Sequence, residues 1–179
     1  MNTHDARLPQ GLVIGLVLLG VIARLVPHPW NVTPLTALAL FGAALLSRRW
    51  AIGLPLTAVI LSDAVLGFHE VIAFTWGGFV LTGLIGWWLR KRVSIGRLVI
   101  ASLLGSTVFF LVTNFGVWLL GEGGTMYPKT VQGVWLCYTA ALPFFRNGLF
   151  GDLVYTLTIF GLFTMATKAH ALHGLVRTR

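Results

Sequence analysis

Six apolar runs, each about the length of a helix, recur along the chain and constrain its fold more than any other feature. They fall at 11–27, 33–47, 51–68, 71–89, 97–120 and 147–167. A helix that crosses a bilayer needs about 20 apolar residues, and several of these runs are shorter. A soluble domain carries about 25% charged residues, whereas only 10% of these 179 residues are charged and 56% are hydrophobic. The pattern predicts an all-α membrane protein, with residues 1–179 forming one domain built as a bundle of six transmembrane helices.

A seventh apolar stretch, at 130–145, is short and contains Pro143. Lysine and arginine concentrate in the cytoplasmic loops of membrane proteins, so their positions decide between six and seven spans. With six spans and both termini inside, ten of the thirteen basic residues lie on the cytoplasmic side: Arg7, Arg48, Arg49, Arg90, Lys91, Arg92, Arg97, Lys168, Arg177 and Arg179. Seven spans would move the basic C-terminus outside. We therefore expect six spans, with 130–145 forming a short external helix or re-entrant cap between helices 5 and 6.

The net charge of +8 would favour a nucleic-acid partner in a soluble protein. In this chain the charge follows from basic cytoplasmic loops, so the lipid bilayer is the expected partner and nucleic acid is not. Small residues at helical spacing also predict close helix packing. They are Gly11 with Gly15, Ala39 with Ala43, Gly78 with Thr82 and Gly86, and Ala101 with Gly105. The Ala39 and Ala43 pair alternatively suits a docking face for a partner membrane protein.

Charged residues interrupt the apolar runs at four places that the six-span arrangement brings to one layer near the outer face. The acids are Asp63, within VILSDAVLGFHE, and Asp152; the bases are Arg24 and Arg146. A charge at membrane depth costs several kcal/mol unless it is paired or hydrated. These residues therefore form either ion pairs that lock helices together or part of a ligand site. We favour the site for Asp63 and Arg146 and leave both readings open for Arg24 and Asp152.

Three short loops on the outer side hold most of the remaining polar and aromatic groups. The prolines of VPHPWNVTP stiffen the first loop, which carries a ring nitrogen, an indole and an amide suited to ligand capture. Interfacial tryptophans also serve simply as membrane anchors. The second loop is Phe68-His69-Glu70, and the third is the glycine-rich GEGGTMYPKTVQG. We expect a shallow outer pocket, floored by Asp63 and Asn114 and roofed by the third loop with 130–145. The candidate substrate-binding residues are His28, Trp30, Asn31, Asp63, Phe68, His69, Trp76, Asn114, Tyr127 and Arg146.

Motifs that carry catalysis are absent from the sequence. There is no phosphate-binding glycine loop, no nucleophile elbow and no HExxH zinc spacing, so an enzyme is not the expected function. His28 and His69 are each candidate metal ligands, because neutral imidazole is the commonest protein ligand for metals. A lone histidine near a helix end is, however, more often an ordinary interfacial residue.

Several stretches resemble a known family of small bacterial membrane proteins. They are PHPWNVTPLTALALFGA, LPLTAVILSDAVLGFH, TNFGVWL and YPKTVQGVWLCYTAALPFFRNGLFGDLVYT, which lie between Arg24 and Thr156. They are similar to the BtuM-like group of solitary S-components. S-components are the substrate-binding subunits of energy-coupling-factor vitamin transporters, and this group is associated with vitamin B12.

The resemblance implies six helices in a bacterial inner membrane and a pocket open to the periplasm that binds cobalamin. It points to His28, Asp63 and Arg146 as polar pocket residues and to an energy-coupling ATPase module as a possible partner; no intrinsic cofactor is implied. A flat corrinoid wants aromatic walls, and Trp30, Phe68, Trp76, Tyr127 and Trp135 are candidates for them.

One departure from the family pattern concerns cobalt. Better-known B12-binding members carry a cobalt-ligating cysteine near the start of helix 4, and the corresponding HEVIAFTWGGF has none. Cys137 lies elsewhere, in the apolar cap, so thiolate-dependent decyanation is not expected. Cobalt would then be ligated by His28 or His69, or keep its own axial base.

Other readings of the sequence remain open. The same scaffold suits another vitamin, haem or a metal chelate as its ligand. A structural membrane subunit without any small ligand is a further alternative, and an enzyme is the weakest.

Overall fold

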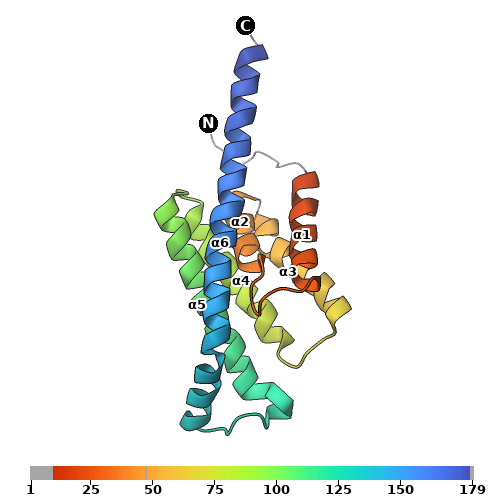
Figure 1. The fold of residues 1–179 in the computed structure, drawn as a ribbon, viewed down its shortest axis with the longest axis vertical. Helices are drawn as coiled ribbons and strands as arrows, with labels where there is room; N and C mark the ends of the chain where they lie inside the picture. The colour runs from red at the N-terminus through yellow and green to blue at the C-terminus, as the bar shows by residue number, and fades with distance from the viewer. Residues whose placement is uncertain (1–9, 47, 178–179) are drawn as a thin grey trace.

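The computed structural model describes residues 10–46 and 48–177, which form six α-helices and no strand. The helices are α1 (Gln10–Leu25), α2 (Leu35–Leu45), α3 (Arg48–Leu66), α4 (Ile72–Leu89), α5 (Ile95–Gly124) and α6 (Val131–Arg177). Figure 1 shows them gathered into one elongated bundle. The all-α fold with six helices is therefore confirmed over the described residues.

Successive helices alternate in direction, so the loops divide between two ends of the bundle. The α1–α2 and α3–α4 loops contribute His28 and His69 to one cavity, and Glu70 reaches the backbone of Gly123 at the end of α5. At the opposite end, the Arg90 guanidinium, just after α4, donates to the carbonyls of Ala43 and Leu46, which close α2. A cation near the C-terminus of a helix also stabilises that helix, because the helix dipole is negative at this end. The α1–α2, α3–α4 and α5–α6 loops lie at one end of the bundle, which we call the cavity end. Helix α1 begins and helix α6 ends at the opposite end (Figure 1).

Helix α2 forms the centre of the bundle. Every residue of Leu35–Ala44 is buried, and α2 contacts each of the other five helices. Its 11 residues are apolar all round except for Thr36, which is the pattern of a helix enclosed by protein. At 1.5 Å per residue α2 is only about 16 Å long. It is therefore shorter than the roughly 30 Å hydrocarbon core of a bilayer.

Three helices in the described part of the chain are long and apolar enough to cross a membrane. They are Ile72–Leu89, Ile95–Gly124 and Val131–Ala169, and shorter apolar helices accompany them. Many of their large apolar side chains are exposed, as expected for residues that face lipid. This helix composition is that of a multi-pass membrane protein.

Residues 130–145 do not form the separate cap expected from the sequence. They are the first part of α6, which continues through Pro143 for 47 residues. Proline removes one backbone donor, but the side chains on either side of it pack against α5. Phe145 stacks on Phe110 at 4.5 Å, and the Tyr138 hydroxyl donates to Leu111 O at 2.7 Å. This tertiary packing keeps the helix continuous where the local sequence predicted a break.

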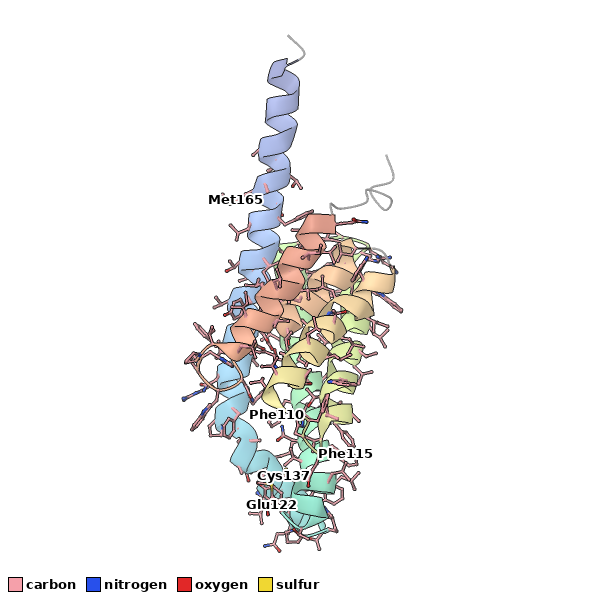
Figure 2. The ribbon with its side chains drawn as sticks, turned by 90° about the vertical axis from the view of Figure 1, so that its right-hand side faces the viewer. Phe110, Phe115, Glu122, Cys137 and Met165 are labelled. Carbon is pink, nitrogen blue, oxygen red and sulfur yellow. The ribbon has the colours of Figure 1, made fainter. Side chains whose placement is uncertain are left out.

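The far end of α6 projects beyond the other helices. Figure 2 shows Met165 on this projecting part, with Glu122 and Cys137 at the opposite end of the molecule. Met165 is 69% exposed and Leu162 is 62% exposed.

Glycine and alanine positions allow the helices around α2 to approach closely. A side chain on Gly86 would place its Cβ 2.6 Å from Ala43 Cβ and 3.0 Å from Leu40 Cα. Ala39 and Ala43 are both fully buried in this packing. Their alternative reading as a docking face for another membrane protein is therefore wrong, because α2 has no free face.

Replacing Gly86 by alanine tests this packing. The added methyl group meets the backbone of α2, so we expect Gly86→Ala to lower the free energy of unfolding by about 1–3 kcal/mol. Gly77→Ala in the same helix is the matched control, because no atom of the surrounding residues, apart from the adjacent backbone of α4 itself, lies within 4 Å of its Cβ position. That control should be stabilising by about 0.5–1 kcal/mol. Unfolding in mixed detergent micelles measures both, and equal effects of the two variants would contradict the close contact.

Candidate functional site

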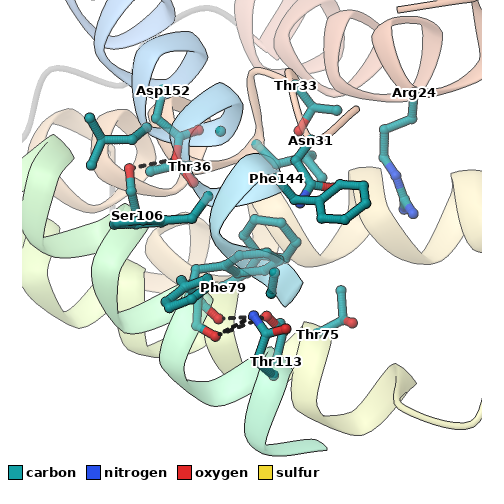
Figure 3. A pocket seen from close by; sticks show the side chains of 18 of the residues that line it. Arg24, Asn31, Thr33, Thr36, Thr75, Phe79, Ser106, Thr113, Phe144 and Asp152 are labelled. Carbon is teal, nitrogen blue, oxygen red and sulfur yellow. Dashed lines mark hydrogen bonds between the residues drawn. The ribbon is translucent and has the colours of Figure 1, made fainter. Parts of the chain in front are cut away.

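A cavity of about 490 Å³ opens at the cavity end, and all six helices contribute to its lining. Figure 3 shows the arrangement from close by. Exposed residues of the loops, including His28, Asn31 and His69, form its mouth. Buried residues, including Thr36, Ser106 and Asp152, form its closed end. The volume lies within the roughly 300–1,000 Å³ range of small-molecule sites.

Phenylalanines from α4, α5 and α6 make the cavity walls. They are Phe79, Phe109, Phe110, Phe144 and Phe145. Phe79 and Phe109 lie 4.5 Å apart between ring centroids, so these rings also support one another. The walls offer flat apolar surface, and orientation of a ligand is left to the polar groups at the two ends.

The α1–α2 loop reaches the cavity because small residues on α6 let it approach. A Cβ at Gly151 would lie 2.9 Å from Val32 Cγ1, and one at Gly148 would lie 3.4 Å from Asn31 O. Within this loop the Nδ1–H of His28 donates to Val26 O at 2.7 Å. The other ring nitrogen, Nε2, then carries the lone pair of the neutral imidazole.

A buried carboxyl group lies at the closed end. Asp152 is 7% exposed, and its Oδ2 is 2.7 Å from the Ser106 hydroxyl. Thr36 lies beside the same carboxyl in Figure 3. Thr156 and Ser102 continue the polar contacts behind it, with 3.5 Å between their hydroxyl oxygens. Polar groups of this kind at membrane depth are functional candidates.

Beside the cavity, an ion pair connects three helices. Arg24 Nη1 of α1 lies 2.7 Å from Asp63 Oδ1 of α3, and Trp76 Nε1 of α4 donates to Asp63 Oδ2 at 2.9 Å. The same Nη1 donates to Ser62 Oγ at 2.7 Å and to Val59 O at 3.2 Å. Asp63 is 1% exposed and does not line the cavity, whereas Arg24 does. Asp63 therefore holds helices together through Arg24, and the pocket floor expected from it is instead formed by Asp152 and Ser106.

The structure brings four of the ten candidate residues into the cavity lining: His28, Asn31, His69 and Asn114. Six lie outside it. Trp30 is exposed, and its ring centroid lies 5.3 Å from that of Phe144. The indole N–H of Trp76 donates to Asp63. Phe68 and Arg146 are exposed, and Tyr127 is half-buried away from the cavity.

The third loop is anchored to its surroundings and does not roof the cavity. Glu70 accepts from the Gly123 amide through both carboxylate oxygens at 3.2 Å. Lys129 donates to the carbonyls of Trp118 and Leu119, which satisfies the end of α5. Of residues 130–145, only Ala141, Phe144 and Phe145 line the cavity.

Sequence reasoning missed the aromatic walls and the closed end. None of the expected wall residues (Trp30, Phe68, Trp76, Tyr127 and Trp135) lines the cavity. A usable signal was present in α5, where Ser102 and Ser106 share one face of an apolar helix at i, i+4 spacing. Together with the intramembrane Asp152, that face marked the polar end.

No group of three or more metal-ligating side chains occurs among residues 10–46 and 48–177. His28 and His69 are separate imidazoles at the cavity mouth, and their assignment as axial ligands of cobalt stays a prediction.

The chain belongs to a family of unknown function, DUF6580. The family model matches residues 6–173, nearly the whole chain. No match to a curated protein was found, and none to a solved structure. This member of the family is a helical protein with three long apolar helices among the residues that the structure describes.

The ion pair between Arg24 and Asp63 makes a prediction about stability. Removing one partner of a buried pair leaves an uncompensated charge and typically costs about 3–5 kcal/mol. We expect Arg24→Leu to lower the free energy of unfolding by that order, and Arg24→Leu with Asp63→Leu to recover most of it. The double-mutant cycle is measured by detergent unfolding. Arg146→Leu, at an exposed position, is the control and should change stability by about 0.5 kcal/mol or less. Additive losses in the double variant would contradict the pairing.

Proposed function

We propose that the protein is a membrane substrate-binding and uptake protein of the S-component type. It would capture a vitamin at the outer face and release it to the cytoplasm. The observation that carries the proposal is the cavity, which is open at one end of the helix bundle. It combines phenylalanine walls with a few polar groups, the composition of small-molecule sites in general.

The distribution of charge supports an outward-facing cavity in a bacterial inner membrane. The cluster Arg90, Lys91 and Arg92 lies at the end opposite the cavity, and α1 begins and α6 ends there too. Basic loops face the cytoplasm in membrane proteins. In a six-span arrangement with both termini inside, the mouth with His28 and His69 faces the periplasm.

Cobalamin or a related corrinoid is the first candidate ligand, on the resemblance to BtuM-like S-components. His28 suits axial ligation because its Nδ1–H is bound to Val26 O and its Nε2 lone pair is available. A complete cobalamin is larger than a cavity of about 490 Å³, so much of it would remain at the mouth beside His28 and His69. An energy-coupling ATPase module would be the partner that drives release.

A smaller vitamin is the second candidate, and the cavity volume favours it. A volume of about 490 Å³ suits a drug-sized ligand that is largely enclosed. Such a ligand would reach the polar closed end, which a macrocycle held at the mouth would not fill.

The absorption spectrum of protein purified from cells fed cobalamin tests the first candidate. We expect a bound corrinoid band, and a shift of that band in His28→Ala that reports loss of an axial imidazole. Cys137→Ala is the control, because that thiol is buried and lies outside the cavity lining. In a B12-auxotrophic host without its own importer, the protein should support growth on trace cobalamin. Colourless protein and no growth, with normal expression, would exclude a corrinoid and leave the smaller vitamin.

A further inference from the structure

Asp152 is the one acid in the cavity lining, and it lies where the cavity is most enclosed. Its side chain comes from α6 and meets Ser106 of α5 and Thr36 of α2 (Figure 3). Arg24 stands on the opposite side of the cavity in the same view. Arg24 and Asp152 therefore lie apart from each other in the cavity lining.

No cationic side chain among the described residues forms an ion pair with the carboxyl of Asp152. The single ion pair in the described part of the chain joins Arg24 to Asp63, so the cavity's arginine is already neutralised. The imidazoles of His28 and His69 are exposed at the mouth, away from the buried end. Ionisable residues within membrane-spanning segments almost always face the bundle interior or a cavity, pair with another polar group, and mark substrate or ion pathways. A cation that enters the cavity would supply this missing charge.

Hydroxyl groups satisfy only part of what this carboxyl can accept. An ionised carboxylate offers about four acceptor positions, and each hydroxyl has one proton to donate. Ser106 Oγ is also 2.9 Å from Ser102 O, so its one proton is shared between two acceptors. Acceptor capacity therefore remains for a donor that enters the cavity.

We infer that the cavity binds a compact aromatic cation, with its positively charged nitrogen at Asp152 and its ring between the phenylalanine walls. This rests on the proposed ligand-binding function and names the class of ligand for the same site. Aromatic rings attract cations through their negative faces, so the walls and the carboxylate favour the same charge. A neutral amide, such as those at the edge of a corrinoid, would donate to Asp152 without supplying the missing charge.

Three probes with one ring and different charges test the inference: benzamidinium, benzamide and benzoate. Dissociation constants for the full-length protein in lipid nanodiscs are measured by ligand-observed NMR titration. We expect benzamidinium to bind at least about tenfold more tightly than benzamide, and benzoate more weakly than both. Asp152→Asn should reduce the preference to about twofold or less, whereas Asp152→Glu should keep it. Glu122→Gln removes an exposed acid outside the cavity and should leave the preference unchanged.

The wild-type series decides the inference even if a variant at Asp152 fails to fold. Equal affinity for benzamidinium and benzamide would overturn the cationic class while leaving ligand capture intact. Binding of none of the probes would also overturn it, and the corrinoid spectrum would then decide the proposed function separately. A preference for benzamidinium that persists in Asp152→Asn would assign the cation to another group.

Discussion

Helix α2 is apolar apart from Thr36 and is too short to reach across a bilayer, and the other five helices enclose it. This enclosure sets how closely they approach, through contacts such as Gly86 against Ala43. It also fixes the cavity, because Leu35 and Thr36 at the start of α2 form part of its lining. At the other end Arg90 closes α2 by binding its last carbonyls. One apolar helix thus has a ligand-sized space at its start and a cationic cap at its end.

Charge is used differently on the two sides of the cavity. Arg24 and Asp63 neutralise each other beside it and connect three helices through Trp76. Asp152 remains without a basic partner among the described residues and is held by hydroxyl groups. An ion pair of this kind fixes the geometry of the helices, whereas an unpaired carboxyl leaves a position for a ligand to complete.

The apolar runs predicted most of the helices, because apolar segments of this length have little alternative to helix in a bilayer. They did not predict the joining of 130–145 to α6, which depends on Tyr138 and Phe145 packing against α5. For the site, the loop residues His28, Asn31 and His69 were predicted correctly. Successive helices alternate in direction, so every second loop lies at the same end of the bundle. The phenylalanine walls were not found, since which side of a helix faces the cavity is set by tertiary packing. Tertiary packing also decides that Asp63 faces Arg24 and not the cavity, because Arg24 lies 39 residues earlier in the chain.

Helix α6 lines the cavity with Phe144 and Asp152 and then continues without interruption to the far end of the molecule. Its 47 residues span about 70 Å at 1.5 Å per residue. This exceeds the roughly 40–45 Å of a whole bilayer with its headgroups. The helix is therefore longer than a bilayer is thick, and its far part, where Leu162 and Met165 are exposed, extends past the other helices. The distance from Asp152 to the end of α6 is about 38 Å by the same rise, so a tilt of about 10° at the cavity would sweep that end through roughly 7 Å. A change in the direction of α6 at the cavity would therefore be largest at the opposite end of the molecule.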